Sequence, residues 1–180
     1  MNRGAHIAAV SRRLAEHFRG RLLRQDDPDY AAAARVWNGM FDSLPGLIAR
    51  CRDAEDVQVA IGVANATGVT TAIRCGGHSL AGFSTCKGGL VIDLSEMCQV
   101  QVDEGTRKAR FSGGCLLGTV DAETQKFGFA FPAGVVSHTG AGGLILRGWN
   151  WLAEPSLRTI LRQRSGFHLG PRGRLGAAGG

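Results

Sequence analysis

The chain has 180 residues, of which 44% are hydrophobic and 20% are charged, and its net charge at pH 7 is +6. This length provides one domain with a core, but not comfortably two domains. No apolar run approaches the ~20 residues of a membrane-spanning helix, and the N-terminus lacks the continuous apolar stretch of a secretory signal. We therefore predict a soluble globular protein of the cytoplasm, with no membrane partner.

The positive charge is concentrated at the C-terminal end. Residues after Ile145 contain six arginines and one glutamate, so they carry most of the net charge. The rest of the chain is almost neutral, which argues against a nucleic-acid-binding protein and leaves binding of nucleic acid or acidic membrane by this tail as a minor alternative. The five cysteines show no C-x-x-C spacing, so we expect reduced thiols and no metal site.

The first 34 residues predict a helical lead. Apolar residues recur at three- and four-residue steps from Ile7 to Leu22, which is typical of one face of an amphipathic helix over about Ala5–Arg24. The acidic segment Asp26–Asp29 breaks this pattern. The alanine-rich segment Tyr30–Val36 then predicts another helical turn or two.

A strand–helix–strand unit follows. Gly46–Cys51 predicts a strand, and the acids of Asp53–Asp56 predict the start of a helix with an apolar face from Val57 to Ala64. The β-branched run Gly68–Ile73 predicts a second strand. Because a helix connects the two strands, we predict that they are parallel.

The next segment predicts three further strands. Leu90–Leu94 has the pattern of a short buried strand. Gln99–Asp103 and Lys108–Ser112 alternate between apolar and polar residues on either side of the turn Glu104–Thr106, which is typical of a hairpin.

The remaining pattern is helical and then irregular. Leu116–Lys126 predicts a helix, Phe129–Pro132 an extended segment, and Ala133–Leu144 a loop of small residues. Beyond Arg147 hydrophobic periodicity fades and no strand is predicted, and Leu175–Gly180 is expected to be a disordered end.

A paired-glycine bend follows the second predicted strand. Gly76 and Gly77 have no Cβ, so main-chain N–H groups can approach a ligand closely, and successive N–H groups form an anion site suited to a pyrophosphate. Arg74 adds a positive charge, His78 a ring nucleophile and Ser79 a hydroxyl donor. A solvated charge at Arg74 is the alternative to a phosphate ligand.

Five motifs and the predicted strand at Leu47–Cys51 follow one another along the chain. The motifs are Trp37-Asn38, Arg74-x-Gly-Gly-His-Ser, Val91-Ile92-Asp93-Leu94-Ser95, Gly113-Gly114 and Pro132-Ala133-Gly134-Val135-Val136-Ser137-His138-Thr139-Gly140. In order and spacing they resemble the FAD-binding half of the vanillyl-alcohol-oxidase and p-cresol-methylhydroxylase superfamily, nearest its berberine-bridge-enzyme-like oxidases. The resemblance runs from roughly Arg35 to Leu146, and it implies an α+β, PCMH-type fold of two small α/β subdomains that hold FAD between them, incomplete here at the C-terminus.

The resemblance also implies the site residues. The first FAD-binding segment, around the pyrophosphate, comprises Arg74, Cys75, Gly76, Gly77, His78 and Ser79. The second comprises Pro132, Gly134, Val135, Ser137, His138, Gly140, Gly142 and Gly143. His78 matches the histidine that bonds to the flavin 8α-methyl carbon, and Val136 stands where some relatives have a second, cysteinyl link, so one covalent bond is expected. His138 is either a flavin contact or a surface residue, and no residue is assigned as a catalytic base.

The resemblance implies an FAD-dependent oxidoreductase that passes hydride from a small-molecule substrate to flavin N5 and then electrons to molecular oxygen. The alternatives are a truncated remnant without turnover and a non-covalent, reductase-like FAD domain. Relatives continue past the second segment with a glycine run, whereas this chain has Arg147 and then an Arg/Gly/Pro/Leu mixture. We therefore expect a helical lead at 1–34, a partial FAD-binding domain at 35–146, and an aberrant or disordered basic tail at 147–180, produced by truncation or a frame shift near Arg147.

Overall fold

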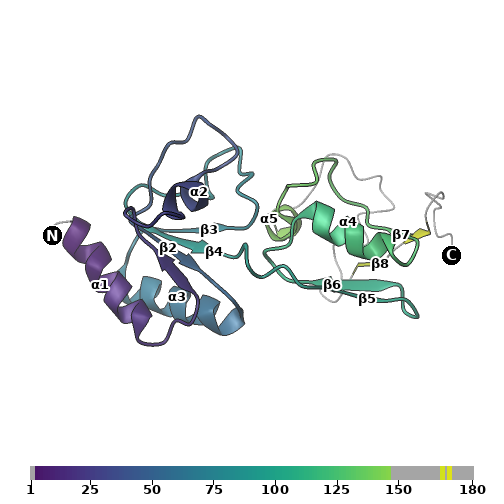
Figure 1. The fold of residues 1–180 in the computed structure, drawn as a ribbon, viewed down its shortest axis with the longest axis horizontal. Helices are drawn as coiled ribbons and strands as arrows, with labels where there is room; N and C mark the ends of the chain where they lie inside the picture. Colours follow the sequence, from purple (N-terminus) through teal and green to yellow (C-terminus); the bar gives the residue numbers. More distant parts are fainter. Residues whose placement is uncertain (1–2, 147–166, 169, 172–180) are drawn as a thin grey trace. The chain divides into compact units, whose positions relative to one another are not determined.

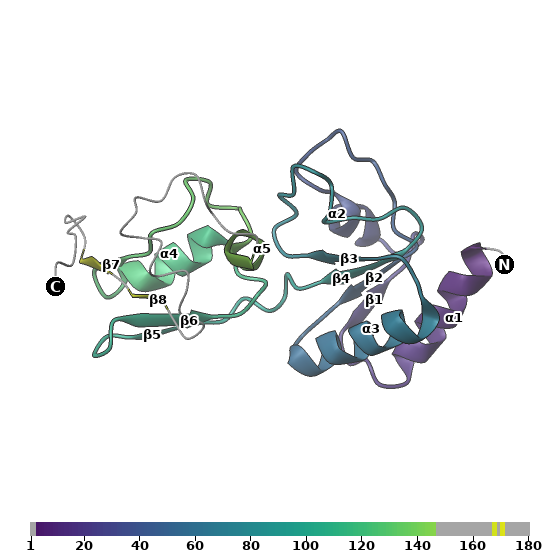
Figure 2. The same ribbon diagram turned by 180° about the vertical axis from the view of Figure 1, so that it is seen from behind.

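The computed structural model describes residues 3–146, 167, 168, 170 and 171. The chain divides into two compact units, residues 1–97 and residues 98–180. Figures 1 and 2 show the helices and strands of both units.

A four-stranded sheet forms the centre of the first unit. Its strands lie in the order β1 (Arg21–Leu23), β2 (Leu47–Arg50), β4 (Leu90–Asp93) and β3 (Thr71–Arg74). β2 and β3 both run parallel to β4, whereas β1 is antiparallel to β2. The predicted parallel orientation of β2 and β3 is therefore confirmed, although β4 lies between them.

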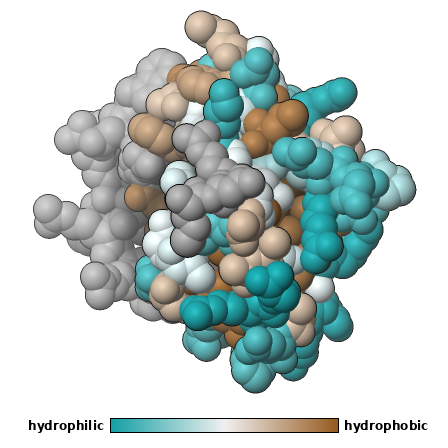
Figure 3. Space-filling model, turned by 90° about the vertical axis from the view of Figure 1, so that its left-hand side faces the viewer, coloured by the Kyte–Doolittle hydropathy of each residue, from teal (hydrophilic) through white to brown (hydrophobic). Residues whose placement is uncertain are grey.

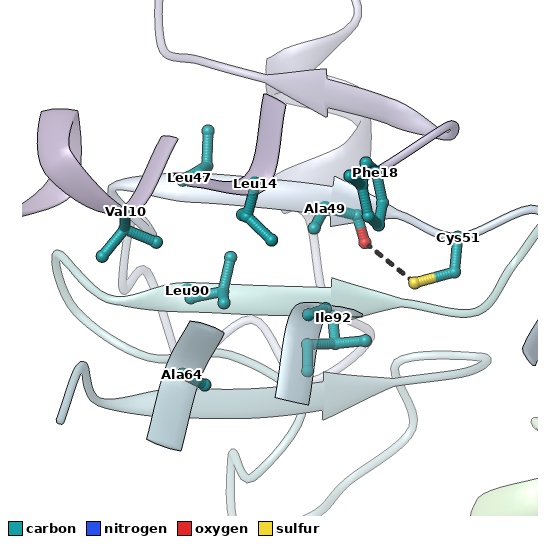
Figure 4. Packing of buried hydrophobic residues seen from close by; sticks show 10 residues of the cluster. Val10, Leu14, Phe18, Leu47, Ala49, Cys51, Ala64, Leu90 and Ile92 are labelled. Atoms are coloured by element: carbon teal, nitrogen blue, oxygen red, sulfur yellow. Dashed lines mark hydrogen bonds between the residues drawn. The ribbon is translucent and has the colours of Figure 1, made fainter. Parts of the chain in front are cut away.

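Helices cover both faces of this sheet. α1 (Arg3–Ala15) and α3 (Ala54–Thr67) lie on one face, and α2 (Tyr30–Ala34) lies on the other (Figures 1 and 2). Because side chains alternate along a strand, Leu47 of β2 packs into the core beneath α1 and α3, whereas Ile48 packs on the α2 side. Figure 4 shows the first of these cores, which includes Val10, Leu14, Phe18, Leu47, Ala49, Cys51, Ala64, Leu90 and Ile92.

The N-terminal segment differs from the prediction of one helix over about Ala5–Arg24. α1 ends at Ala15, and residues 21–23 form β1, an edge strand of the sheet. A Cβ at Gly20 would overlap the carbonyl oxygen of Arg50, so the main chain passes very close to the end of β2 at this point. Extended backbone there lets β1 hydrogen-bond to β2, and this tertiary pairing overrides the helical pattern.

The ends of α3 follow the sequence signals. Asp53 is the N-cap residue, and its Oδ1 accepts a hydrogen bond of 3.0 Å from the Asp56 amide. Gly68 ends the helix with φ +63° and donates its N–H to the carbonyl of Ala64 at 2.9 Å. The predicted helix start at Asp53 and end near Gly68 are confirmed.

The second unit contains the predicted hairpin and helix. β5 (Val100–Asp103) and β6 (Lys108–Phe111) pair antiparallel, and α4 (Leu117–Gln125) packs against them. The core of this unit contains Ala109, Cys115, Leu117, Val120, Phe129, Phe131 and Ala141.

Three short elements of the second unit were not predicted. α5 (Ala141–Leu146) converts the end of the expected small-residue loop into a helix. β8 (Phe167–His168) pairs with β6, and β9 (Gly170–Pro171) pairs with β7 (Phe129–Ala130). The prediction of no strand beyond Arg147 is therefore wrong at these positions, because pairing to strands already formed outweighs the weak local pattern. The predicted disorder of 175–180 lies outside the described residues.

The face drawn in Figure 3 has a mixed surface. Hydrophilic side chains make up much of the coloured surface in Figure 3, with smaller hydrophobic patches among them. None of the helices in the described part of the chain is both long and apolar enough to cross a bilayer.

Candidate functional site

The paired-glycine bend begins where β3 ends. Arg74 is the last residue of β3, and Gly77 has φ +69°, a left-handed conformation that favours glycine. A Cβ placed on Gly77 would lie 3.5 Å from Nε of Arg74 and 3.7 Å from Cα of Val36. The bend therefore lies directly against the Arg74 guanidinium.

Two nitrogen atoms of the Arg74 guanidinium are buried without a hydrogen-bond partner in the described part of the chain. These atoms are Nε and Nη1. Burial lowers the pKa of Arg74, the charge of Asp93 opposes this change, and the charge of Arg50 adds to it. A buried donor without an acceptor is costly, and a guanidinium is well suited to bind a carboxylate or phosphate. The arrangement therefore fits an anionic ligand.

Three charged residues lie at the carboxyl ends of the parallel strands. The register aligns Arg50 of β2 and Arg74 of β3 with Asp93 of β4. Asp93 is buried; its Oδ2 lies 3.1 Å from Nε of Arg50, and its Oδ1 accepts a hydrogen bond from the Ser95 amide. Arg50 thus pairs with the Asp93 carboxylate, whose charge also acts on Arg74, at the edge of the sheet where α/β proteins commonly bind ligands. Sequence reasoning missed Arg50 and Asp93, because only the strand order brings them beside Arg74.

Main-chain donors of the bend are also available. The amides of Gly76, Gly77 and Ser79 donate to no group among the described residues. The carbonyl of Gly77 accepts a hydrogen bond from the Trp37 amide at 3.1 Å, and the ring of His78 stacks on the Trp37 indole. Three of the six residues predicted for the first segment therefore supply main-chain N–H donors beside a guanidinium, which fits a pyrophosphate.

The second predicted segment wraps the N-terminus of α4 within the second unit. The Leu117 amide donates to the Thr139 carbonyl at 2.9 Å, and the Gly118 amide donates to the Ser137 carbonyl at 2.7 Å. Gly142 lies against the main chain of Gly113, because a Cβ there would overlap the Gly113 carbonyl oxygen. These contacts give the segment a defined shape.

Exposure varies along the second segment. The side chains of Val135, Ser137 and His138 are exposed, as are Pro132 and Gly143. Gly140 is buried, and Gly134 and Gly142 are half-buried; Gly142 and Gly143 lie on α5 rather than on a loop. The structure therefore brings the residues of each segment together within its own unit. Among the described residues, no cluster of His, Cys, Asp or Glu could hold a metal ion.

Comparison with known proteins decides the family. Residues 45–154 match the FAD binding domain family, which is more than half of the chain. The chain belongs to this FAD-binding domain family. The match contains the bend, the second segment and both strand-end residues that sequence reasoning missed.

Relatives of this FAD-binding domain are FAD-linked oxidoreductases. The chain is 36% identical over 131 residues to (R)-6-hydroxynicotine oxidase of Paenarthrobacter nicotinovorans. The aligned region covers 73% of this chain and 29% of that protein. It is 32% identical over 148 residues to an FAD-linked oxidoreductase of Dictyostelium discoideum, and this alignment covers 82% of the chain and 32% of the relative. The chain thus spans about three tenths of the length of these curated relatives.

Solved structures give the same fold. The crystal structure of 6-hydroxy-D-nicotine oxidase from Arthrobacter nicotinovorans matches with a TM-score of 0.67 and 35% identity, over 68% of this chain and 27% of that one. A xylooligosaccharide oxidase from Myceliophthora thermophila matches with a TM-score of 0.70 and 27% identity, over 75% of this chain and 29% of that one. The expected PCMH-type α+β fold and its cofactor, FAD, are confirmed.

Proposed function

We propose that this FAD-binding domain holds its cofactor through residues 74–79 and 132–143, with His78 linked covalently to the flavin 8α carbon. In the whole protein we propose an oxidase reaction, in which hydride passes from a small-molecule substrate to flavin N5 and electrons then pass to molecular oxygen. The observation that carries the first part is that Nε and Nη1 of Arg74, beside the Gly76–Gly77 bend, are buried and have no acceptor among the described residues.

The residues of the first segment have separable roles in this proposal. Nε and Nη1 of Arg74 donate to phosphate oxygens, which removes the cost of burying them unpaired. The amides of Gly76, Gly77 and Ser79, which donate to no described residue, add further donors to the same group. His78 supplies a ring nitrogen as nucleophile and releases its N–H proton. Bound FAD supplies hydride acceptance and electron transfer, which no side chain provides.

The second segment has its own part in the proposal. The exposed side chains of Val135 and Ser137 are accessible to a ligand, and His138 is exposed beside them, whereas Gly140 and Gly142 shape the main chain around α4. The two relatives named for their substrates act on a hydroxynicotine and a xylooligosaccharide. These substrates differ so widely that the substrate class of this protein is left open.

The cytoplasmic location and the frame shift near Arg147 remain predictions. Sequencing of the transcript tests the frame shift.

The visible spectrum of the purified protein tests the proposal. We expect flavin absorbance that survives acid precipitation in the wild type. His78→Ala should keep flavin until denaturation and lose all of it afterwards. Arg74→Met should bind FAD at least tenfold more weakly, because a bidentate charge-assisted contact contributes about 1.5–3 kcal/mol. Arg12→Met, at an exposed position of α1, is the control and should bind normally.

Each contrary result has a distinct meaning. Flavin released completely from the wild type by acid would reject the covalent link and favour a non-covalent FAD domain. Normal FAD affinity in Arg74→Met would reject the phosphate role of this arginine. A colourless protein that binds no added FAD would show a remnant that lacks the cofactor function.

A further inference from the structure

The indole of Trp37 stacks on the imidazole of His78. The ring centroids are 5.2 Å apart and the ring planes meet at 22°, which is a stacked arrangement. Trp37 is nevertheless 59% exposed. Large aromatic residues usually contribute stability through burial, and most of this side chain is not buried. Its position over the His78 ring therefore requires another explanation.

The main chain holds Trp37 at this place independently of its side chain. The Trp37 amide donates to the Gly77 carbonyl at 3.1 Å, immediately before His78. The Asn38 side-chain amide donates to the carbonyl of Leu80 at 3.0 Å, immediately after the bend, and Asn38 Oδ1 accepts from the Met40 amide. The segment at 37–40 is thus hydrogen-bonded to residues on both sides of His78. These hydrogen bonds place the Trp37 indole against the His78 imidazole.

We propose that Trp37 is a positioning residue that holds the His78 ring in the orientation needed for attachment of the flavin. This inference rests on the proposed covalent link. Stacking restricts the imidazole to one plane, so that its nitrogen lone pair points in a fixed direction. Fixing a reactive group in this way lowers the entropy cost of reaching the reactive geometry.

The attachment step balances without any further reagent. A C–N bond forms between an imidazole nitrogen and the 8α carbon, a C–H bond of that methyl group breaks, and the imidazole gives up its N–H proton. The electron pair and the two hydrogens pass to the flavin ring, which is thereby reduced by two electrons. Molecular oxygen, already the acceptor in the proposed reaction, reoxidises it.

The test compares three variants of the full chain. Trp37→Ala removes the ring, Trp37→Phe keeps an aromatic ring, and Met40→Ala is the control at an 87% exposed position of the same segment. The first measurement is the proton NMR shift of the His78 ring, assigned with His78→Gln. The second is the rate at which added FAD becomes acid-stable. The third is FAD affinity in the His78→Gln background.

We expect Trp37→Ala to move the His78 ring signals downfield by loss of the indole ring current and to slow attachment by about tenfold. Trp37→Phe should restore the rate to within about threefold, and Met40→Ala should change neither quantity. In the His78→Gln background, adding Trp37→Ala should leave the FAD affinity unchanged, which separates positioning from binding.

An attachment rate in Trp37→Ala equal to that of the wild type would overturn the proposal. A loss of FAD affinity on adding Trp37→Ala to His78→Gln, as large as the loss of attachment rate, would overturn it as well. Unchanged His78 signals in Trp37→Ala would show that the stack is absent in solution. Failure of the wild type to attach flavin would instead reject the covalent link on which the inference rests, and the NMR shifts would still report whether the rings stack.

Discussion

Two glycines of the first unit are predicted to respond oppositely to alanine. Gly89 is buried just before β4, and an added Cβ would overlap the Thr70 carbonyl oxygen and lie 2.9 Å from the Cys86 Sγ. Gly62 lies in the middle of α3, and an added Cβ there meets no atom within 4 Å. Gly89 does not have a positive φ, so the effect of alanine at this position is steric rather than conformational.

The expected magnitudes follow from these contacts. A rigid carbonyl cannot move aside as a flexible side chain can, so Gly89→Ala should cost about 1–3 kcal/mol of stability through overpacking. Gly62→Ala should raise stability by about 0.5–1 kcal/mol, because glycine loses more backbone entropy in a helix than alanine does. In a unit of this size, 1 kcal/mol corresponds to a change in Tm of about 4–8 °C.

Thermal unfolding followed by circular dichroism at 222 nm measures both changes. We expect a Tm for Gly89→Ala at least about 4 °C below the wild type, and a Tm for Gly62→Ala a few degrees above it. A Gly89→Ala protein as stable as the wild type would refute the close approach of Thr70 and Gly89. A destabilised Gly62→Ala protein would refute the open surroundings of α3 at this position.

Two further predictions concern buried ionisable groups of the same unit. Asp93→Asn should lower the free energy of unfolding by about 3 kcal/mol in urea titrations, because Arg50 then loses its buried carboxylate partner and the positive charge of Arg74 is no longer offset by Asp93. An unchanged midpoint would contradict this. Burial, followed by the charges of Asp56, Asp93 and Asp53, raises the pKa of the Cys51 thiol to about 12. The unfolded thiol has a pKa of about 8.5, so stability from this group is complete below that pH and is lost as the pH rises toward 12, at up to about 1.4 kcal/mol per pH unit. Cys51→Ala should flatten the decline of stability between about pH 8.5 and 10, and an equal decline in both proteins would exclude this origin.

Local signals in the sequence predicted the elements whose ends depend on neighbouring residues. Asp53 and Gly68 mark the two ends of α3. The alternation of apolar and polar residues on both sides of Glu104–Thr106 predicted the hairpin of β5 and β6. β1 was missed because Leu22 continues the helical spacing of α1, and only the adjacent β2 strand gives that segment an extended partner. The residue pattern around Leu22 could not reveal its pairing partner Ala49, which lies 27 residues further along the chain.

The candidate site was predictable to the same extent. The Gly76–Gly77 bend, Arg74 and His78 follow from residue types in sequence, because a glycine pair after a strand has local meaning. The alignment of Arg50, Asp93 and Arg74 depends on β4 lying between β2 and β3, which no local pattern encodes. The stack of Trp37 on His78 was likewise unpredicted, since 40 residues of chain separate the two rings.

The strand order of the first unit has a consequence for synthesis of the protein. β2 and β3 leave the ribosome before β4, yet they do not pair with each other, because each pairs with β4, which comes after both. A nascent chain that stops before Leu90 therefore lacks the strand that pairs with both β2 and β3. Its core beneath α1 and α3 also lacks Leu90 and Ile92. The complete sheet and its core can therefore form only after β4 has left the ribosome, and until then the growing chain leaves apolar side chains of this unit exposed.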